Sequence, residues 1–143
     1  MSDITITYPA NIRALVSHGA IIMPGVAGSA TAVGKVVALA SDGEWDSADA
    51  NVSQALARVQ GMVVESFDGE TSIAAGSALS VCVFGPVSGI GGLTAGANYY
   101  ISDNVGMLAD AVGAYDRIVG WGVKLAGEVC LFINPEQNDP SSA

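Results

Sequence analysis

The second half of this chain repeats part of its first half. A Ser-Asp turn, an Ala-Asp-Ala triplet and a β-rich run follow one another at residues 41–64 and again at residues 102–123. Each copy continues through an Ala-Gly pair into a second apolar run that carries one cysteine, Cys82 in the first copy and Cys130 in the second. This self-similarity predicts a body built by duplication of one strand-turn-strand unit.

Short runs rich in β-branched and aromatic residues alternate with turn residues along the whole chain. Strands are expected at residues 4–8, 20–23, 35–39, 60–65, 79–84, 98–101, 118–124 and 128–133. Turns are expected at residues 23–25, 41–43, 67–69, 85–86, 102–104 and 126–127. One helix of one or two turns is expected within residues 47–59. No long amphipathic helix separates the strands, so the pattern predicts an all-β fold, either a small β-barrel or a β-sandwich.

Charge is distributed unevenly along the chain. Residues 1–34 hold one acid, Asp3, and one base, Arg13, whereas residues 35–143 hold 13 acids and 4 bases and therefore the whole net charge of −9. We interpret residues 1–33 as an N-terminal arm with a Gly-rich connection, residues 34–135 as the duplicated β body, and residues 136–143 as a mobile polar tail. An acidic body repels phosphate backbones, so no direct binding of nucleic acid is expected.

The low charge content bears on oligomeric state. Charged residues make up 13% of the chain, against about 25% in ordinary soluble domains. Such a surface favours an oligomer or a docked subunit, and the alternative is a compact monomer with a Ser/Thr/Asn/Gly surface. Two stretches without acids or bases, residues 14–34 and 71–102, contain Pro and several Gly, and so do not read as lipid-facing helices. No membrane role is expected.

The residues form no recognisable catalytic, cofactor or metal motif. Gly34-Lys35 lacks the preceding glycine and the following Ser or Thr of a phosphate-binding loop. The single histidine, His18, has no partner in the sequence around it, and the acids at residues 42–49 lack the spacing of a calcium loop. We therefore expect no enzymatic activity, no cofactor and no metal, although a pair of carboxylates that meet only in space stays open.

Cysteine and aromatic residues have two readings each. Cys82 and Cys130 lie in apolar runs without a Cys-x-x-Cys motif, which favours buried free thiols, and a disulfide between them stays open. Four aromatic residues, Trp45, Tyr99, Tyr100 and Trp121, are expected in the core or in an oligomer interface. On exposed loops they would instead provide surfaces on which sugars stack.

Several segments of the second copy follow a pattern common in virion proteins of tailed bacteriophages. They are Leu93-Thr94-Ala95-Gly96, Tyr99-Tyr100-Ile101-Ser102, Val119-Gly120 and the terminal run 131–135. Across residues 34–135 the chain resembles capsid decoration (cement) proteins, and it shares strand-turn motifs with phage head fibre and spike proteins. The resemblance implies a small β-rich homotrimer, assembled in the bacterial host cytoplasm and added to the outside of an icosahedral head, without catalytic residues.

We therefore expect a structural virion protein that binds the outer surface of a phage head and stabilises it by bridging capsomers. The expected partner is the major capsid protein, and the expected contact lies in the arm, whose net charge is zero. The capsid-contact candidates are Ile4, Ile6, Tyr8, Ile12 and Arg13. The alternative is a fibre, spike or baseplate component that recognises a host surface receptor. A polysaccharide-degrading enzyme is the least favoured reading.

Overall fold

The computed structural model describes residues 2–49, 60–135 and 141–142. These residues contain β-strands and two short 3₁₀ turns, η1 (Pro9–Asn11) and η2 (Val16–His18), and no α-helix. The predicted all-β class is confirmed. The helix expected within residues 47–59 falls largely outside the described residues, and its first residue belongs to a strand.

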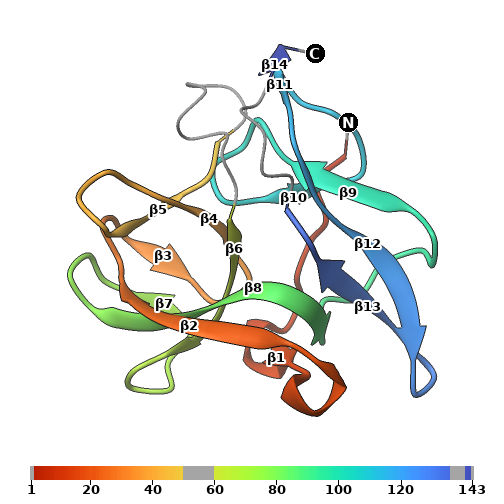
Figure 1. The fold of residues 1–143 in the computed structure, drawn as a ribbon, viewed down its shortest axis with the longest axis horizontal. Helices are drawn as coiled ribbons and strands as arrows, with labels where there is room; N and C mark the ends of the chain where they lie inside the picture. Colours follow the sequence, from red (N-terminus) through yellow and green to blue (C-terminus); the bar gives the residue numbers. More distant parts are fainter. Residues whose placement is uncertain (1, 50–59, 136–140, 143) are drawn as a thin grey trace.

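One large sheet contains most of the strands (Figure 1). Its members are β1 (Arg13–Ala14), β2 (Ile21–Val26), β4 (Val36–Leu39), β5 (Trp45–Ser47), β6 (Gly61–Ser66), β8 (Ala78–Ser88), β9 (Asn98–Ile101), β10 (Leu108–Ala109), β12 (Ile118–Leu125) and β13 (Glu128–Ile133). Two small ribbons complete the fold. They pair β3 (Thr31–Ala32) with β7 (Ser72–Ile73), and β11 (Tyr115–Asp116) with β14 (Ser141–Ser142).

The strand order reflects the repeat in the sequence. The sheet runs β10-β9-β12-β13-β8-β6-β4-β5, so the first copy contributes β5-β4-β6-β8 and the second contributes β10-β9-β12-β13 in the same order. Every one of these pairings is antiparallel. The copies join where β13 pairs with the end of β8, for example Leu131 with Val87. The duplicated strand-turn-strand unit predicted from the sequence therefore has the same strand pairing in both halves.

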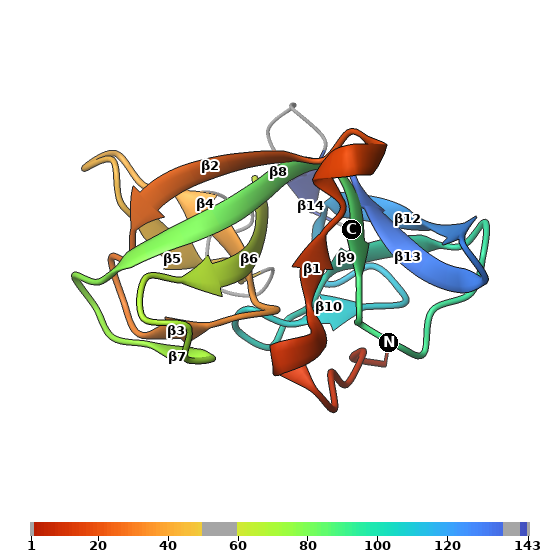
Figure 2. The same cartoon turned by 90° about the horizontal axis from the view of Figure 1, so that it is seen from below.

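Strand β8 is shared by both halves. Cys82 in its first part pairs with Ile22 of β2 and with Met62 of β6, so these two strands flank it. Val87 near its end pairs with Ala14 of β1 and with Leu131 of β13. Seen from below, β8 runs from the strands of the first copy, on the left, to the boundary with the strands of the second copy, on the right (Figure 2). An 11-residue strand with neighbours on both edges ties the two copies together.

The turn expected at Gly85-Pro86 is wrong, because β8 continues through both residues. Gly85 takes φ 101°, and a side chain there would approach the Cα of Ala20 to 2.6 Å. Glycine therefore allows residues 19–20 to cross closely over the strand. The carbonyl of Pro86 accepts a hydrogen bond from the Leu15 N–H at 2.9 Å, so this proline serves the sheet as an acceptor alone.

The turn expected at residues 23–25 is also wrong, since β2 runs unbroken from residue 21 to residue 26. Beyond it, Ala27 forms a parallel bridge with Trp45, and the Gly28 N–H donates to the Trp45 carbonyl at 2.8 Å. A side chain at Gly25 would lie 2.3 Å from the indole nitrogen of Trp45. The glycine therefore lets β2 cross the tryptophan, and strands β2-β8-β6-β4-β5 curl back on themselves.

The turns expected at residues 41–43, 67–69 and 126–127 are confirmed. At the last of these, Ala126 and Gly127 have φ values of 50° and 84°, as a two-residue hairpin between β12 and β13 requires. The strand expected at residues 4–8 is wrong. Only Asp3 forms an isolated bridge there, with Ala109, before the chain turns into η1.

The predicted boundary at residue 34 does not coincide with a break in the structure. Strands β1 and β2 precede it, and both pair with β8. In the predicted tail, Ser141 and Ser142 pair with Asp116 and Tyr115, whereas residues 136–140 and 143 lie outside the described residues.

The core draws on both copies and on the N-terminal segment. Its buried side chains include Ile12, Val36, Val37, Met62, Val63, Val81, Ile101, Leu108, Leu131 and Ile133. Trp45 and Tyr99 are each 3% exposed, which places these two aromatic side chains in the core as expected. Tyr100 is half-buried.

Both thiols are free and buried, as predicted, and burial raises the pKa of Cys82 and of Cys130. Since the thiolate is the reactive form, the folded protein should react slowly with a disulfide reagent such as Ellman's reagent, and both thiols should react rapidly once denaturant is added. Absorbance of the released chromophore measures this. Fast modification of either cysteine in the native protein would contradict the buried positions.

Candidate docking site

The N-terminal segment packs on its own body. Ile12 is 1% exposed in the core, and Ile4 and Ile6 pack partly against it. Figure 2 shows the segment running between the strands of the first copy and those of the second. Three of the five predicted contact residues therefore have partners within the chain, because their apolar side chains fill the boundary between the copies.

Polar contacts fasten the start of the segment to the second copy. The Asp3 carboxylate accepts hydrogen bonds from Ser102 Oγ at 2.5 Å and from Asn104 Nδ2 at 2.6 Å. The Ser2 N–H donates to Asp110 Oδ1 at 2.8 Å, and the Ile4 N–H donates to the Leu108 carbonyl at 2.7 Å. The repeated Ser-Asp turn of the second copy thus acts as an anchor for the chain's beginning.

Tyr8 and Arg13 are the two predicted contact residues that face solvent. Tyr8 is 67% exposed. Arg13 donates from Nη1 to the carbonyls of Ala10 and Ile12, each at 2.7 Å. These bonds satisfy two carbonyls of the turn around η1 and hold the guanidinium at the surface.

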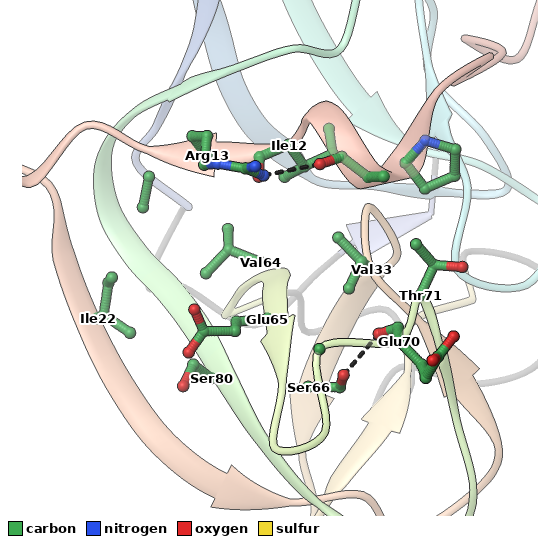
Figure 3. A pocket seen from close by; sticks show the side chains of 14 residues that line it. Ile12, Arg13, Ile22, Val33, Val64, Glu65, Ser66, Glu70, Thr71 and Ser80 are labelled. Atoms are coloured by element: carbon green, nitrogen blue, oxygen red, sulfur yellow. Dashed lines mark hydrogen bonds between the residues drawn. The ribbon is translucent and has the colours of Figure 1, made fainter.

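A groove of about 460 Å³ lies beneath residues 9–14, between them and strands β6 and β8 (Figure 3). Ile22, Val33 and Val64 give it apolar lining. Its charged lining residues are Arg13 on the side of the N-terminal segment and Glu65 and Glu70 on the opposite side. A smaller cavity of about 190 Å³ lies nearby and is lined by Ile4 and Ile6, among others.

The loop after β6 shapes one wall of this groove. Ser66 Oγ donates to Asp68 Oδ1 at 2.9 Å and to the Glu70 carbonyl at 2.5 Å. The Glu70 N–H donates to Asp68 Oδ1 at 3.0 Å, and this bond, together with the one from Ser66, holds the pKa of Asp68 below its usual value. The loop is thereby fixed, and Glu70 is presented at the groove by a rigid turn.

The second candidate feature is an exposed apolar area that we call the β2 surface. It comprises Ile21 and Met23 of β2 together with Phe84 of β8, which are between 40% and 54% exposed. Ile22 and Val26 are 39% and 37% exposed and lie on the opposite face of the strand. Ile21 and Phe84 are register partners, so the area is continuous across both strands. Within the described residues, β2 pairs with β8 along one edge, and its other edge meets only the Ala27–Trp45 bridge at its end.

An aromatic row extends the β2 surface across the sheet. The Phe84 ring meets the Phe132 ring edge-on with centroids 5.2 Å apart, and Phe132 stacks on Trp121 at 5.2 Å. Trp121 and Phe132 are half-buried. Apolar surface therefore continues from the edge strand β2 toward β12.

The sequence interpretation missed the β2 surface, although two signals mark it. Residues 14–34 contain no Asp, Glu, Lys or Arg, and Pro24 stands in the middle of the strand. Proline within a strand is typical of a sheet edge. Together they indicate an edge strand without charges.

The groove beneath residues 9–14 and the β2 surface are the two features suited to docking. Within residues 2–49, 60–135 and 141–142, no group of three His, Cys, Asp or Glu side chains is placed to hold a metal ion. Helices long and apolar enough to cross a membrane are not found in the same residues.

Comparisons of the chain with protein-family models, with curated proteins and with solved structures gave no match.

Proposed function

We propose that this chain is a structural protein of a tailed-phage virion that binds the outside of the head and stabilises it by bridging capsomers. The observation that carries the proposal is that this acidic body exposes apolar side chains in two separate areas, the groove beneath residues 9–14 and the β2 surface. Contiguous exposed apolar side chains are typical of surfaces that contact another protein. The resemblance across residues 34–135 supports the same function.

The physical role follows from linkage. A subunit that binds the assembled shell and not its dispersed parts shifts the equilibrium toward the shell. Such a subunit needs a rigid body and a docking surface. The duplicated sheet, with β8 held on both edges, provides the rigid body.

We assign the contact with the major capsid protein to the groove and to its exposed neighbours Tyr8 and Arg13. The groove combines apolar lining with one cationic and two anionic side chains, so it suits a protein segment of mixed character. Ile4, Ile6 and Ile12 act in this proposal by holding the N-terminal segment in place. The protein works as a homotrimer on the head.

Co-sedimentation with undecorated heads tests this assignment. Arg13→Glu should weaken binding by at least about tenfold, because one contact charge is reversed beside Glu65 and Glu70. Lys124→Glu is the matched control, since it makes the same charge change on the exposed hairpin of β12. Equal losses in both variants, or unchanged binding of Arg13→Glu, would remove the groove from the proposal.

The aromatic row favours one second candidate, a fibre or spike component that recognises a host glycan. Stacked aromatic side chains with a half-exposed face can bind sugar rings. Trp121 and Phe132 are the residues for this role, because Trp45 and Tyr99 are buried. Binding to a glycan array that is lost in Trp121→Ala would support this candidate over the cement role.

A further inference from the structure

We propose that the β2 surface is where copies of this chain contact one another, through side-chain packing of Ile21, Met23 and Phe84 and not through a shared sheet. The proposal rests on the proposed function and deepens it, because it separates the contact between copies from the contact with the shell.

Exposure marks this surface as unusual within the molecule. Ile21 and Met23 are two residues apart on β2, so their side chains lie on the same face of the strand, and they are 54% and 46% exposed. Single exposed apolar residues are ordinary, whereas a contiguous group on an edge strand favours association. Phe84, 40% exposed, extends the group onto β8. A partner that covers the group removes this apolar area from water.

The distribution of charge along the chain indicates that the partner at this surface is a second copy of the chain. The chain carries a net charge of −9, and residues 35–143 hold all of it. Two such bodies repel each other wherever acidic surfaces meet. Strand β2 lies within residues 14–34, which contain no acid or base. It therefore offers a face on which like-charged copies can meet with little repulsion, and an uncharged apolar face is complementary to itself.

Backbone hydrogen bonding argues against a continuous sheet between copies. The Ala27 N–H donates to the Ser77 carbonyl at 2.9 Å, and the Gly76 N–H donates to the Ala27 carbonyl at 2.7 Å. Hydrogen-bonded positions alternate along an antiparallel pair, so Gly25 and Met23 also direct their backbone groups toward β8. Ile22, Pro24 and Val26 direct theirs toward the free edge.

Proline interrupts that edge. Pro24 has no N–H, and the end of β2 is already occupied by the contact with Trp45. Proline on a sheet edge hinders the addition of another strand. Copies therefore meet through the side chains of the β2 surface. Ile22 lines the groove, whereas Ile21, Met23 and Phe84 do not, so these last three belong to the contact between copies alone.

Sedimentation velocity over a concentration series tests the proposal. The full chain should sediment as an oligomer, and Ile21→Glu with Met23→Glu should raise the dissociation constant by at least about a hundredfold, since two carboxylates are placed in an apolar contact. Val105→Glu is the matched control, because Val105 is 56% exposed and lies outside the β2 surface. It should sediment as the unchanged protein does.

At a protein concentration low enough for the unchanged chain to be monomeric, thermal unfolding of the double variant should match that of the unchanged chain, because both side chains are about half exposed. A chain that is monomeric throughout the series, or a folded double variant that still assembles normally, would overturn the proposal. Equal disruption by Val105→Glu would overturn it as well. Self-association through β2 without any binding to heads would instead overturn the proposed function and leave this inference intact.

Discussion

Replacing Ile12 with alanine should lower the free energy of unfolding by about 2–5 kcal/mol, the usual cost of removing a large aliphatic side chain from a packed core. Ile12 is 1% exposed and joins the N-terminal segment to the core. Urea denaturation followed by fluorescence measures the change. Tyr8→Ala is the control, because Tyr8 is 67% exposed and its loss should change the free energy of unfolding by less than about 0.5 kcal/mol.

This pair of variants separates structural support from contact with the shell. Ile12→Ala should weaken shell binding only as far as it unfolds the segment, whereas Tyr8→Ala should act on binding without changing stability. An Ile12→Ala protein of unchanged stability that no longer binds heads would contradict the core position. A deletion of residues 2–13 would not separate structural support from contact with the shell, because it removes Ile12 from the core together with the exposed residues.

Replacing Gly89 with alanine should destabilise the protein by about 2–5 kcal/mol, the sum of backbone strain and of crowding against a neighbouring chain. Gly89 has φ 88°, and a Cβ there would lie 2.1 Å from the carbonyl oxygen of Asn11. The backbone of residues 11–12 would have to move away from β8. Chemical denaturation at equilibrium measures the loss.

Gly91→Ala provides the control for strain alone. Gly91 has φ 77°, but a Cβ there meets no atom within 4 Å, so the expected cost is about 1–2 kcal/mol. The difference between the two variants measures how closely the N-terminal segment approaches β8. Equal destabilisation by both would mean that the segment does not pack against Gly89.

The elements with clear local signals could be predicted from the sequence. The strands at residues 98–101 and 128–133 have the predicted bounds, because turn residues border them on both sides. The duplication also predicted that the two halves share one pairing scheme. In both cases the information lies within a short stretch or in the comparison of two stretches.

The errors arose where distant residues decide the local conformation. Gly25 follows Pro24, and Gly85 precedes Pro86. Both dipeptides are typical of turns. Each instead lies inside a strand, because Trp45 crosses the first and Ala20 crosses the second. The position of Ile12 depends in the same way on a contact with β8, some 75 residues away in the sequence, as the Arg13–Ser88 pairing of β1 illustrates.

The candidate site was predicted only in part. The sequence interpretation assigned the apolar residues of the N-terminal region to a partner, whereas the structure packs Ile4, Ile6 and Ile12 against the chain itself. Hydrophobicity alone does not distinguish a residue that fills its own core from one that awaits a partner. The exposed fraction of each side chain makes that distinction. It identifies Ile21 and Met23, which are about half exposed, as residues available to a partner.

Under the proposed function, the most direct test mixes the purified chain with expanded, undecorated heads of its phage, and measures bound copies per head and the temperature at which the heads disrupt. The proposed role predicts saturable binding at a ratio fixed by the symmetry of the head, with a raised disruption temperature. Heads that bind no chain, or that bind it without any gain in disruption temperature, would contradict the cement role.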